Sequence, residues 1–378
     1  MVCINIIECF KQLMKISIGA QIIDGPFGGG NEFVKNLSNK LIDCGHEVIN
    51  NLKERDIDII ILINPLKDSE ISTFDNFDID YYINFVNKKT ISFQRINECD
   101  ERKNTNFVNK SIIFSNKNID VNIFVSEWLK KIYLDQGIRS KKSFVFKGGP
   151  SETIFFKKSS KKLIENEKIK IVTHHWSNNI MKGFDIYKKL DTLLNQNEFS
   201  NKYEFTIIGN TPANMEFSNT KIISPLYGIE LSKELKKHDI YITGSKNEPS
   251  GNHHMEAAMC GLPILYFRSG GVYEYCKDFG LEYENNNLKE KIIEITENYD
   301  LYVQKLNNYP FSFENAFEEF LDFINNVISN KEDIYKNREQ TIKFLIFLNY
   351  IINKVKKILI RGISKLKIKT SFLVKKLK

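Results

Sequence analysis

The sequence predicts an α/β protein of two doubly wound domains, followed by a helical tail. Short apolar runs typical of buried parallel strands recur along most of the 378 residues and alternate with helical patterns. A glycine-rich loop follows the first of these runs, at 25–30, as in a βαβ opening. A second strand–loop–helix pattern lies at 240–263. The length is sufficient for two domains of ordinary size.

The first domain is expected over 14–150, preceded by an extension at 1–13 that lacks the features of a signal peptide. Three consecutive glycines precede its first helix, so the backbone can approach a ligand in front of a helix N-terminus. The loop is not GxGxxG, and no acidic residue clearly ends the second strand, which disfavours a nicotinamide dehydrogenase. The expected strands are 15–22, a second strand into which 45–48 leads, 57–63, 90–94, 120–126 and 143–146, and the expected helices are 31–44 and 127–136.

A polar run follows the strand expected at 90–94. Open α/β sheets bind ligands outside the carboxyl ends of their strands. Four residues of this run are therefore candidates for a cleft: Arg95, Asn97, Glu98 and Asp100. A charged loop with internal salt bridges explains the same residues about equally well.

The second domain is expected over 151–330. Its expected strands are 169–173, 205–209, 222–226, 240–243 and 264–267, and its expected helices are 229–237, 252–260 and 315–328.

The stretch 244–263 combines an anion site with two hydroxyl acceptors. A helix is expected to begin with Asn252 as its N-cap and to end before Gly261. Backbone N–H groups at this helix start would attract an anion. Glu248 and Glu256 flank the helix start as acceptors for sugar hydroxyls. A nucleoside diphosphate joined to a sugar requires this combination.

The E-x7-E spacing of Glu248 and Glu256, with the run EAAMCGLP at 256–263, resembles retaining glycosyltransferases of the GT-B fold. The resemblance is to glycosyltransferase family 4, the glycosyl transferases of group 1, and covers about 14–330. It implies two Rossmann-like domains that face each other across a cleft. Ser250 and Asn252 depart from the family, which usually has Phe and Leu there.

The resemblance also implies roles for these residues. Glu248 would contact the transferred hexose, and Glu256 the ribose. Lys182, before a glycine, would grip the diphosphate, but Ser177 stands where the family has a second cation. The expected catalytic residues are Glu248 and Lys182. The further nucleotide-sugar-binding candidates are Gly28, Gly29, Gly30, Gly209, Asn210, Ser250, Gly251, Asn252, His253 and Glu256. His174 and His175 are also cleft candidates, because either of them, or Arg268, could replace the missing cation.

No metal or other cofactor is expected, because lysine and the helix dipole would stabilise the leaving group. The D-x-D sequence at Asp78 and Asp80, a manganese motif in other transferases, is interpreted as chance. His174 and His175 are adjacent on a strand and should point apart, which argues against a metal pair. A UDP-sugar is favoured over a GDP-sugar as donor.

Charge distinguishes the tail, 331–378, from the rest of the chain. Fourteen Lys/Arg and three Asp/Glu give the tail a net charge of +11, which leaves −4 for the other residues of a chain of net +7. Nucleic acid is therefore not an expected partner. The tail interleaves Ile and Leu with Lys at helical spacing, and predicts an amphipathic helix on an anionic membrane surface or packed against the body or a partner subunit. No run reaches the ~18 apolar residues that span a bilayer.

The leading hypothesis is transfer of a hexose, with retention, to a glycan or lipid-linked acceptor in surface polysaccharide or glycoconjugate synthesis. The six cysteines form no CxxC pair, which suggests reduced thiols in a cytoplasmic protein. The membrane alternative for the tail would place this protein at the inner face of the membrane. Two alternatives remain open. One is a nucleotide-sugar epimerase or phosphorylase of the same fold. The other is a nucleotide-sugar-binding subunit without catalysis, suggested by Ser177.

Overall fold

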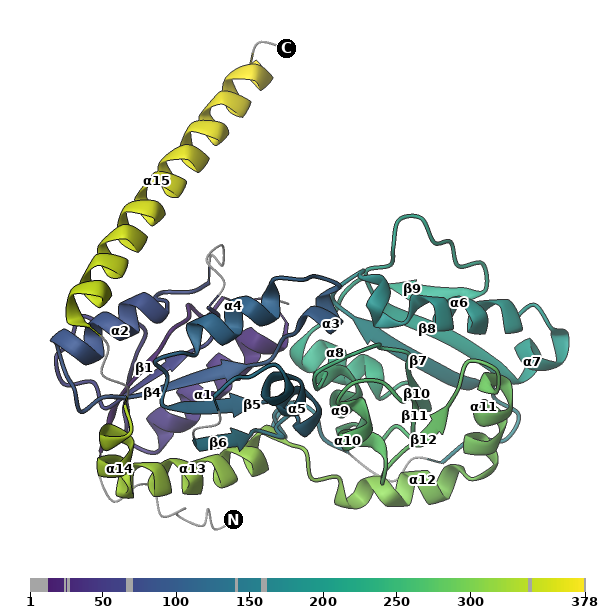
Figure 1. The fold of residues 1–378 in the computed structure, drawn as a ribbon. Helices are drawn as coiled ribbons and strands as arrows, with labels where there is room; N and C mark the ends of the chain where they lie inside the picture. The colour runs from purple at the N-terminus through teal and green to yellow at the C-terminus, as the bar shows by residue number, and fades with distance from the viewer. Residues whose placement is uncertain are drawn as a thin grey trace.

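Two six-stranded parallel sheets, each covered by helices on both faces, form two Rossmann-like domains (Figure 1). This is the predicted fold class. The computed structural model describes residues 13–23, 25, 28–65, 71–139, 142–157, 162–338 and 342–376, with side chains up to residue 359. The extension predicted at 1–13 therefore lies, apart from its last residue, outside the described residues.

The first sheet has the strand order β2-β1-β3-β4-β5-β6. Ile59 and Ile61 enter one core cluster and Ile60 and Leu62 another, so side chains from both faces are buried. This two-sided burial explains the unbroken apolar runs in the sequence. The strands are β1 (Lys15–Ile18), β2 (Glu47–Ile49), β3 (Ile59–Leu62), β4 (Ile91–Ile96), β5 (Val121–Phe124) and β6 (Lys142–Val145).

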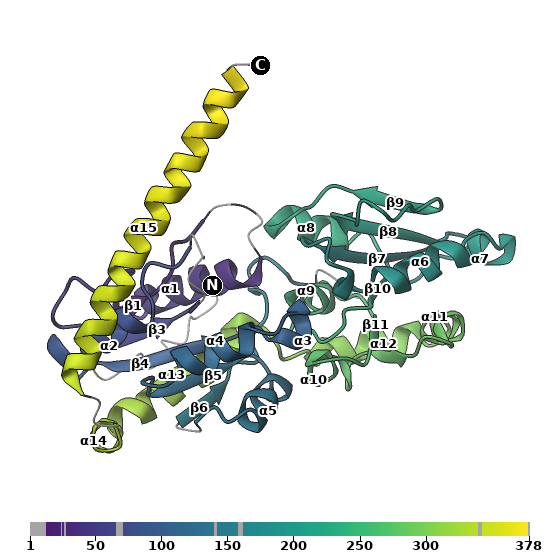
Figure 2. The same cartoon turned by 45° about the horizontal axis from the view of Figure 1, so that its top comes forward.

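Helices cover both faces of this sheet. The helices α1 (Gly29–Asp43) and α13 (Phe313–Ser329) pack in one core cluster. The helix α2 (Asn76–Phe85) belongs to a second cluster, and α4 (Val108–Ser115) and α5 (Glu127–Asp135) form a third around Phe124. The short α3 (Asp100–Lys103) lies between β4 and α4, beside the second domain (Figure 2).

The second sheet has the strand order β12-β11-β10-β7-β8-β9. The order reverses between β7 and β10, and sheets of this kind bind ligands at the carboxyl ends of the strands at such a point. The strands are β7 (Ile169–His175), β8 (Tyr203–Gly209), β9 (Thr220–Ile223), β10 (Ile240–Thr243), β11 (Ile264–Phe267) and β12 (Leu281–Tyr283).

The helices of the second domain divide between the two faces in the same way. One core cluster contains α6 (Phe184–Leu193), α11 (Leu288–Glu297) and α12 (Tyr299–Lys305), and another contains α8 (Gly228–Leu235), α9 (Asn252–Met259) and α10 (Val272–Cys276). The remaining elements are α7 (Asn197–Lys202) and the 3-10 helices η1 (Ile180–Lys182) and η2 (Leu306–Asn308).

After the second domain, the chain returns to the first. Phe317, Phe320 and Ile324 of α13 are buried in the core of the first sheet, and α14 (Lys331–Lys336) follows directly. Arg338 then donates to the carboxylate of Asp120, with Nε and Nη2 at 2.9 and 2.7 Å. This bidentate pair fixes the end of the returning segment on the first domain.

The tail is helical, as predicted, and forms α15 (Lys343–Lys376). It packs on α2, where the rings of Tyr350 and Tyr81 stack at 4.2 Å and Lys357 Nζ lies 2.8 Å from Asp75. Past α2 it projects away from both domains (Figures 1 and 2). None of the described helices is long and apolar enough to cross a membrane.

Several predicted bounds were wrong, among them two helix starts and the ends of two strands, since β1 ends at Ile18 rather than at 22. The helix α1 begins at Gly29 rather than 31, and Gly251, not Asn252, is the N-cap of α9. The residue before each helix, Gly28 or Gly251, has a φ of +81, a conformation that glycine adopts without steric cost. The strand β4 continues past 94, so Arg95 pairs with β5 instead of beginning a loop.

Candidate active site

A cavity of about 340 Å³ lies between the two domains. Its walls come from the loop before α1 and the end of β4 in the first domain, and from the ends of β7 and β10 in the second. These are the carboxyl ends of strands near the two switch points, where the order of each sheet reverses. The predicted residues that line it are Gly28, Gly29, Gly30, Arg95, Asn97, Glu98, His174, His175, Lys182, Glu248, Ser250, Gly251, Asn252, His253 and Glu256.

Glu248 is the most strongly paired carboxylate of the cavity. It lies in the loop after β10 with only 8% of its surface exposed. Its Oε2 atom accepts from Lys182 Nζ at 2.8 Å and lies 3.3 Å from Arg102 Nε. Burial alone would raise the pKa of Glu248, but the two cations outweigh it and lower the pKa to about 2. Glu248 is therefore a carboxylate at any physiological pH.

A glycine loop shapes the backbone that carries Glu248. The N–H of Gly271 donates to the Glu248 carbonyl at 2.8 Å. A side chain at Gly270 would meet that carbonyl oxygen at 2.5 Å, and Gly270 has a φ of +67. The sequence Ser269-Gly270-Gly271 therefore allows the loop after β11 to press against the Glu248 loop.

Lys182 is placed by η1, the single 3-10 turn between β7 and α6. Asn179 caps this turn through its side chain, which accepts from the N–H of Met181 at 2.8 Å. Gly183 ends the turn with φ of +90, and a Cβ there would meet the Gly244 backbone at 2.3 Å. Only glycine after Lys182 allows η1 to lie against the loop of β10. Burial lowers the pKa of Lys182, and Glu248 opposes this shift.

The N-terminus of α9 faces the cavity without a side-chain cap. Gly251 and Asn252 line the cavity at this helix start, so backbone N–H groups and the positive end of the helix dipole are available to an anion. Across the cavity, a Cβ on Gly29 would lie 3.3 Å from Asn252 Nδ2. The glycine loop of the first domain thus lies directly against the start of α9.

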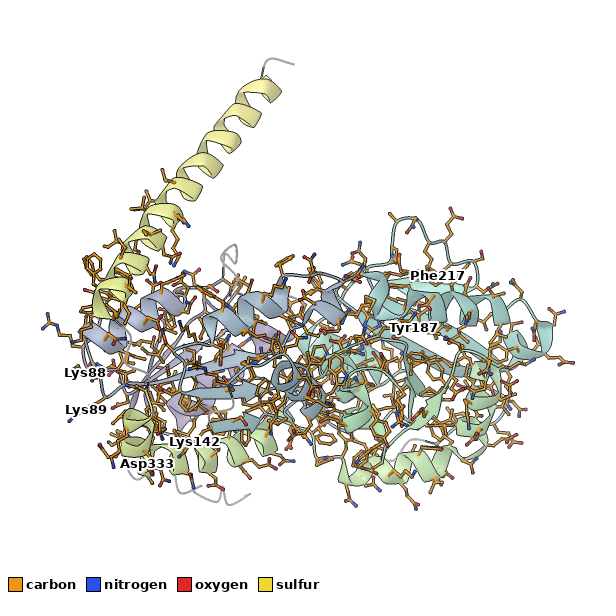
Figure 3. The ribbon with its side chains drawn as sticks, viewed as in Figure 1. Lys88, Lys89, Lys142, Tyr187, Phe217 and Asp333 are labelled. Carbon is orange, nitrogen blue, oxygen red and sulfur yellow. The ribbon has the colours of Figure 1, made fainter. Side chains whose placement is uncertain are left out.

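Four histidines lie at the ends of β7 and α9. His174 Nε2 is 2.6 Å from Glu256 Oε2, whereas His175 Nε2 is 2.6 Å from the hydroxyl of Tyr187. Tyr187 lies inside the second domain (Figure 3). The two neighbours on β7 therefore point to different partners. His253 Nε2 is 2.8 Å from Thr243 Oγ1. Among the described residues, no group of three or more His, Cys, Asp or Glu side chains has the arrangement of a metal site.

Burial lowers the pKa of three of these histidines. His175 and His253 lie well below the usual value, and the pKa of His254 falls to about 3. For His254, burial acts first, Glu248 opposes it, and Lys182 and His174 add to it. These side chains are therefore neutral at pH 7.

The polar run after β4 divides between local and cleft roles. Asp100 does not line the cavity; it accepts from the N–H groups of Val108 and Asn109 at the start of α4, at 2.9 and 3.1 Å. Glu98 lines the cavity but pairs with Lys103 at 2.5 Å. Arg95 lines it with its guanidinium 4.2 Å from the ring centroid of Phe33. Burial lowers its pKa to about 10.

Gly209 and Asn210 also fall outside the residues that line the cavity. A Cβ on Gly209 would lie 1.9 Å from the carbonyl oxygen of His175, so glycine permits the close approach of β7 and β8. Asn210 Nδ2 donates to the Trp176 carbonyl at 2.8 Å. Trp176 itself lines the cavity and is half exposed.

Arg102, the second cation on Glu248, was not predicted from the sequence. Arg102 lies on α3 of the first domain and is buried. Its membership of the polar run was the available signal, but the run alone does not show which of its members crosses to the other domain. Of the groups proposed to replace the missing cation, Arg268 lies over Tyr273 outside the cavity. Ser177 lines the cavity and accepts from the N–H of Asn179.

Comparison with solved structures defines the class of fold as GT-B, the fold of a large group of glycosyltransferases. Sucrose-phosphate synthase from Thermosynechococcus elongatus is similar with a TM-score of 0.59, 11% identity, and coverage of 84% of this chain and 100% of that chain. HepE from Anabaena, in complex with UDP, is similar with a TM-score of 0.62 and 11% identity, and the match covers 83% of this chain and 100% of HepE. A glycosyltransferase from Rickettsia africae is similar with a TM-score of 0.54 and 14% identity, and the match covers 87% of this chain and 100% of that one.

Sequence comparison is more specific for the second domain. Residues 155–309 match the family Glycosyl transferases group 1. This segment contains Lys182, Glu248 and all of α9. No curated protein matches the sequence.

Proposed function

We propose that this protein is a retaining glycosyltransferase, with the properties of family 4, that transfers a hexose from a UDP-sugar to a glycan or lipid-linked acceptor. The observation that carries the proposal is that Lys182, Glu248 and the uncapped start of α9 share one cavity with the glycine loop of the opposite domain. The family match over 155–309 supports the reaction class. The complexes of Anabaena HepE contain UDP and UDP-glucose, which favours the same nucleotide here.

The cavity suits departure of a nucleoside diphosphate from an anomeric carbon. The ammonium of Lys182 and the N–H groups at the start of α9 would stabilise the negative charge that develops on the leaving oxygen. Both groups are in place before the ligand arrives, so little reorganisation is needed at the moment of reaction. No dedicated protein base is assigned. We propose that the acceptor hydroxyl attacks from the face the diphosphate leaves, and that its proton passes to the departing diphosphate oxygen as the anomeric C–O bond breaks.

Glu248 and Glu256 would hold the sugars. The carboxylate of Glu248 pairs with Lys182 and Arg102. A bound diphosphate would compete for Lys182 and release one lone pair of Glu248 to the hexose hydroxyls. Glu256 is oriented by His174 at 2.6 Å and keeps its other oxygen for the ribose.

We propose further that transfer needs no metal. The Asp78 and Asp80 carboxylates of the D-x-D sequence are already engaged. Asp78 lies 2.8 Å from Lys354 and accepts in the capping box of α2, and Asp80 accepts from Asn118 at 2.9 Å. Lys182 and the start of α9 supply the positive charge instead.

The tail suits an anionic membrane surface on the cytoplasmic side, and a lipid-linked acceptor would then lie nearby. The sequence of α15 contains no Asp or Glu. Its described apolar side chains are largely exposed, with Phe344 at 68% and Ile358 at 70%. Each cation near an anionic surface contributes about 1 kcal/mol to binding. Synthesis of surface polysaccharide or glycoconjugates is the setting we propose for this activity.

A thermal-shift screen of UDP- and GDP-sugars, followed by turnover with the stabilising donor, tests the proposal. A donor at about 100 times its Kd should raise the free energy of unfolding by about 2.7 kcal/mol. Turnover should persist in a chelator, and the product should keep the anomeric configuration of the donor. Binding of a donor without turnover on any acceptor would favour a non-catalytic subunit, the reading that Ser177 suggests. For the tail, the full chain should sediment with vesicles of 30% anionic lipid and not with neutral vesicles.

A further inference from the structure

Arg95 is a buried cation that the proposed transfer does not use. It lies on β4, and 8% of its surface is exposed. Its guanidinium lies over the ring of Phe33 in α1, at 4.2 Å, and the residue lines the cavity between the domains. A positive charge is thus held in the wall that the first domain contributes.

The guanidinium has N–H groups without acceptors. Nε and Nη1 are buried and make no hydrogen bond, and within the described part of the chain no carboxylate pairs with Arg95. Among the described residues, Lys182 is the other Lys or Arg that lines the cavity, and it is paired with Glu248 at 2.8 Å. Buried charges in proteins are normally paired, because leaving water without a partner is costly. An anion that binds Arg95 would gain a charge-assisted bond without breaking an existing one.

The position of Arg95 separates it from the anion site of the second domain. Phe33 follows the glycines at 28–30 by one turn of α1, so Arg95 belongs to the glycine-loop wall. Lys182 and α9 belong to the opposite wall. The cavity therefore offers two sites for negative charge, one on each domain.

We propose that Arg95 binds an oxyanion, a phosphate or carboxylate group, of a substrate in this cavity. The proposal rests on the proposed function, because it assumes that the cavity holds the donor and the acceptor. Two substrates could supply the oxyanion: an acidic acceptor, such as a sugar acid or a phosphorylated glycan or lipid, or the diphosphate of the donor. Guanidinium groups bind both kinds of oxyanion in planar, directional pairs.

Titration of the full chain with inorganic phosphate, pyrophosphate and UDP tests the proposal by calorimetry and thermal shift. Arg95→Gln should weaken phosphate or pyrophosphate binding about tenfold, the effect of losing one charge-assisted hydrogen bond. Arg95→Lys keeps the charge but not the planar guanidinium, so its affinity for phosphate or pyrophosphate should lie between those of the wild type and Arg95→Gln. Arg268→Gln removes an exposed guanidinium outside the cavity and should behave as wild type.

The UDP arm identifies the source. A loss of UDP affinity in Arg95→Gln assigns the donor diphosphate, whereas unchanged UDP affinity with lost phosphate binding assigns an acidic acceptor. The melting temperature of ligand-free Arg95→Gln should not fall, because an unpaired charge is removed; a purely structural cation over Phe33 would lower it. Unchanged affinity for all three probes in both variants overturns the proposal. Lys182→Gln distinguishes failure of the proposed function from failure of the Arg95 proposal. Unchanged UDP affinity in Lys182→Gln would contradict the proposed function, whereas the effect of Arg95→Gln on oxyanion binding would still stand.

Discussion

Arg102 of the first domain and Glu248 of the second form a buried ion pair, with Nε and Oε2 at 3.3 Å. The same oxygen accepts from Lys182 at 2.8 Å. Nearby, Asn247 Nδ2 donates to the backbone carbonyl of Glu101 at 3.1 Å, so a side-chain hydrogen bond joins α3 to the β10 loop in addition to the ion pair. The carboxylate proposed to hold the hexose is therefore also a contact between the domains.

Glu248→Gln should lower the free energy of unfolding by about 3–5 kcal/mol, because it leaves two buried cations without an anion. Adding Arg102→Met should recover part of that loss, with a coupling energy of about 1–3 kcal/mol in a double-mutant cycle. Chemical denaturation at pH 7.5 of the wild type, the two single variants and the double variant measures this coupling energy. A double variant that loses the sum of the single losses would show that the pair is absent in solution.

Lys182→Gln should lower kcat/KM by about 10²–10³-fold, the usual effect of removing one group that stabilises developing negative charge. Glu248→Ala should also lose donor turnover, through the hexose contact. Lys246→Gln is the matched control, because Lys246 lies in the β10 loop but pairs with Asp185 at 2.6 Å and does not line the cavity. Equal activity of the Lys182 and Lys246 variants would argue against the assigned role.

Local sequence patterns predicted the elements that place the site. The apolar run Ile240–Thr243 is β10 with the predicted bounds, since a strand buried on both faces needs apolar residues throughout. Gly261, with φ of +84, follows α9 as predicted. Lys182, Glu248 and the start of α9 were expected together and do line one cavity. Their roles in binding and catalysis stay predictions.

Contacts between distant parts of the chain could not be predicted. Arg102 and Glu248 are 146 positions apart and lie in different domains, so no local pattern connects them. Asp100 was placed in the cleft because it follows a strand, yet the nearby start of α4 supplies N–H groups that compete for its carboxylate. The start of α9 was misplaced by one residue because Asn and Gly are both good N-caps.

Gly30→Ala tests whether the donor contacts the glycine loop, because the substitution should affect donor binding without destabilising the fold. A Cβ at Gly30 meets nothing within 4 Å, and the residue is helical, so the substitution should raise the free energy of unfolding by about 0.4–1 kcal/mol. Gly28→Ala should instead lower it by about 1–2 kcal/mol, because Gly28 has φ of +81. If a donor approaches this backbone, Gly30→Ala raises the donor KM although the melting temperature does not fall. An unchanged KM would show that the donor does not contact Gly30.

Acid should destabilise the protein between pH 6.5 and 5 through its buried histidines. Unfolded His254 takes up a proton near pH 6.5, whereas its pKa in the folded protein is about 3. The unfolded state therefore binds more protons in this window, and the stability present above pH 6.5 is lost as the pH falls. At 1.36 kcal/mol per pH unit, His254 contributes a loss of about 2 kcal/mol by pH 5. His175 and His253 act in the same direction.

His254→Leu tests this effect, because both ring nitrogens of His254 lack hydrogen-bond partners among the described residues, and the substitution leaves none of those residues unsatisfied. Stability at pH 8 should change little, while the loss between pH 6.5 and 5 should shrink by about 2 kcal/mol. Denaturation curves at half-unit steps of pH measure both. The range stops above pH 4.5 because Glu248, with its pKa of about 2, adds its own loss below that point. An identical pH dependence in the variant would mean that His254 is protonated in the folded protein, and that the region around α9 admits water or a counter-ion.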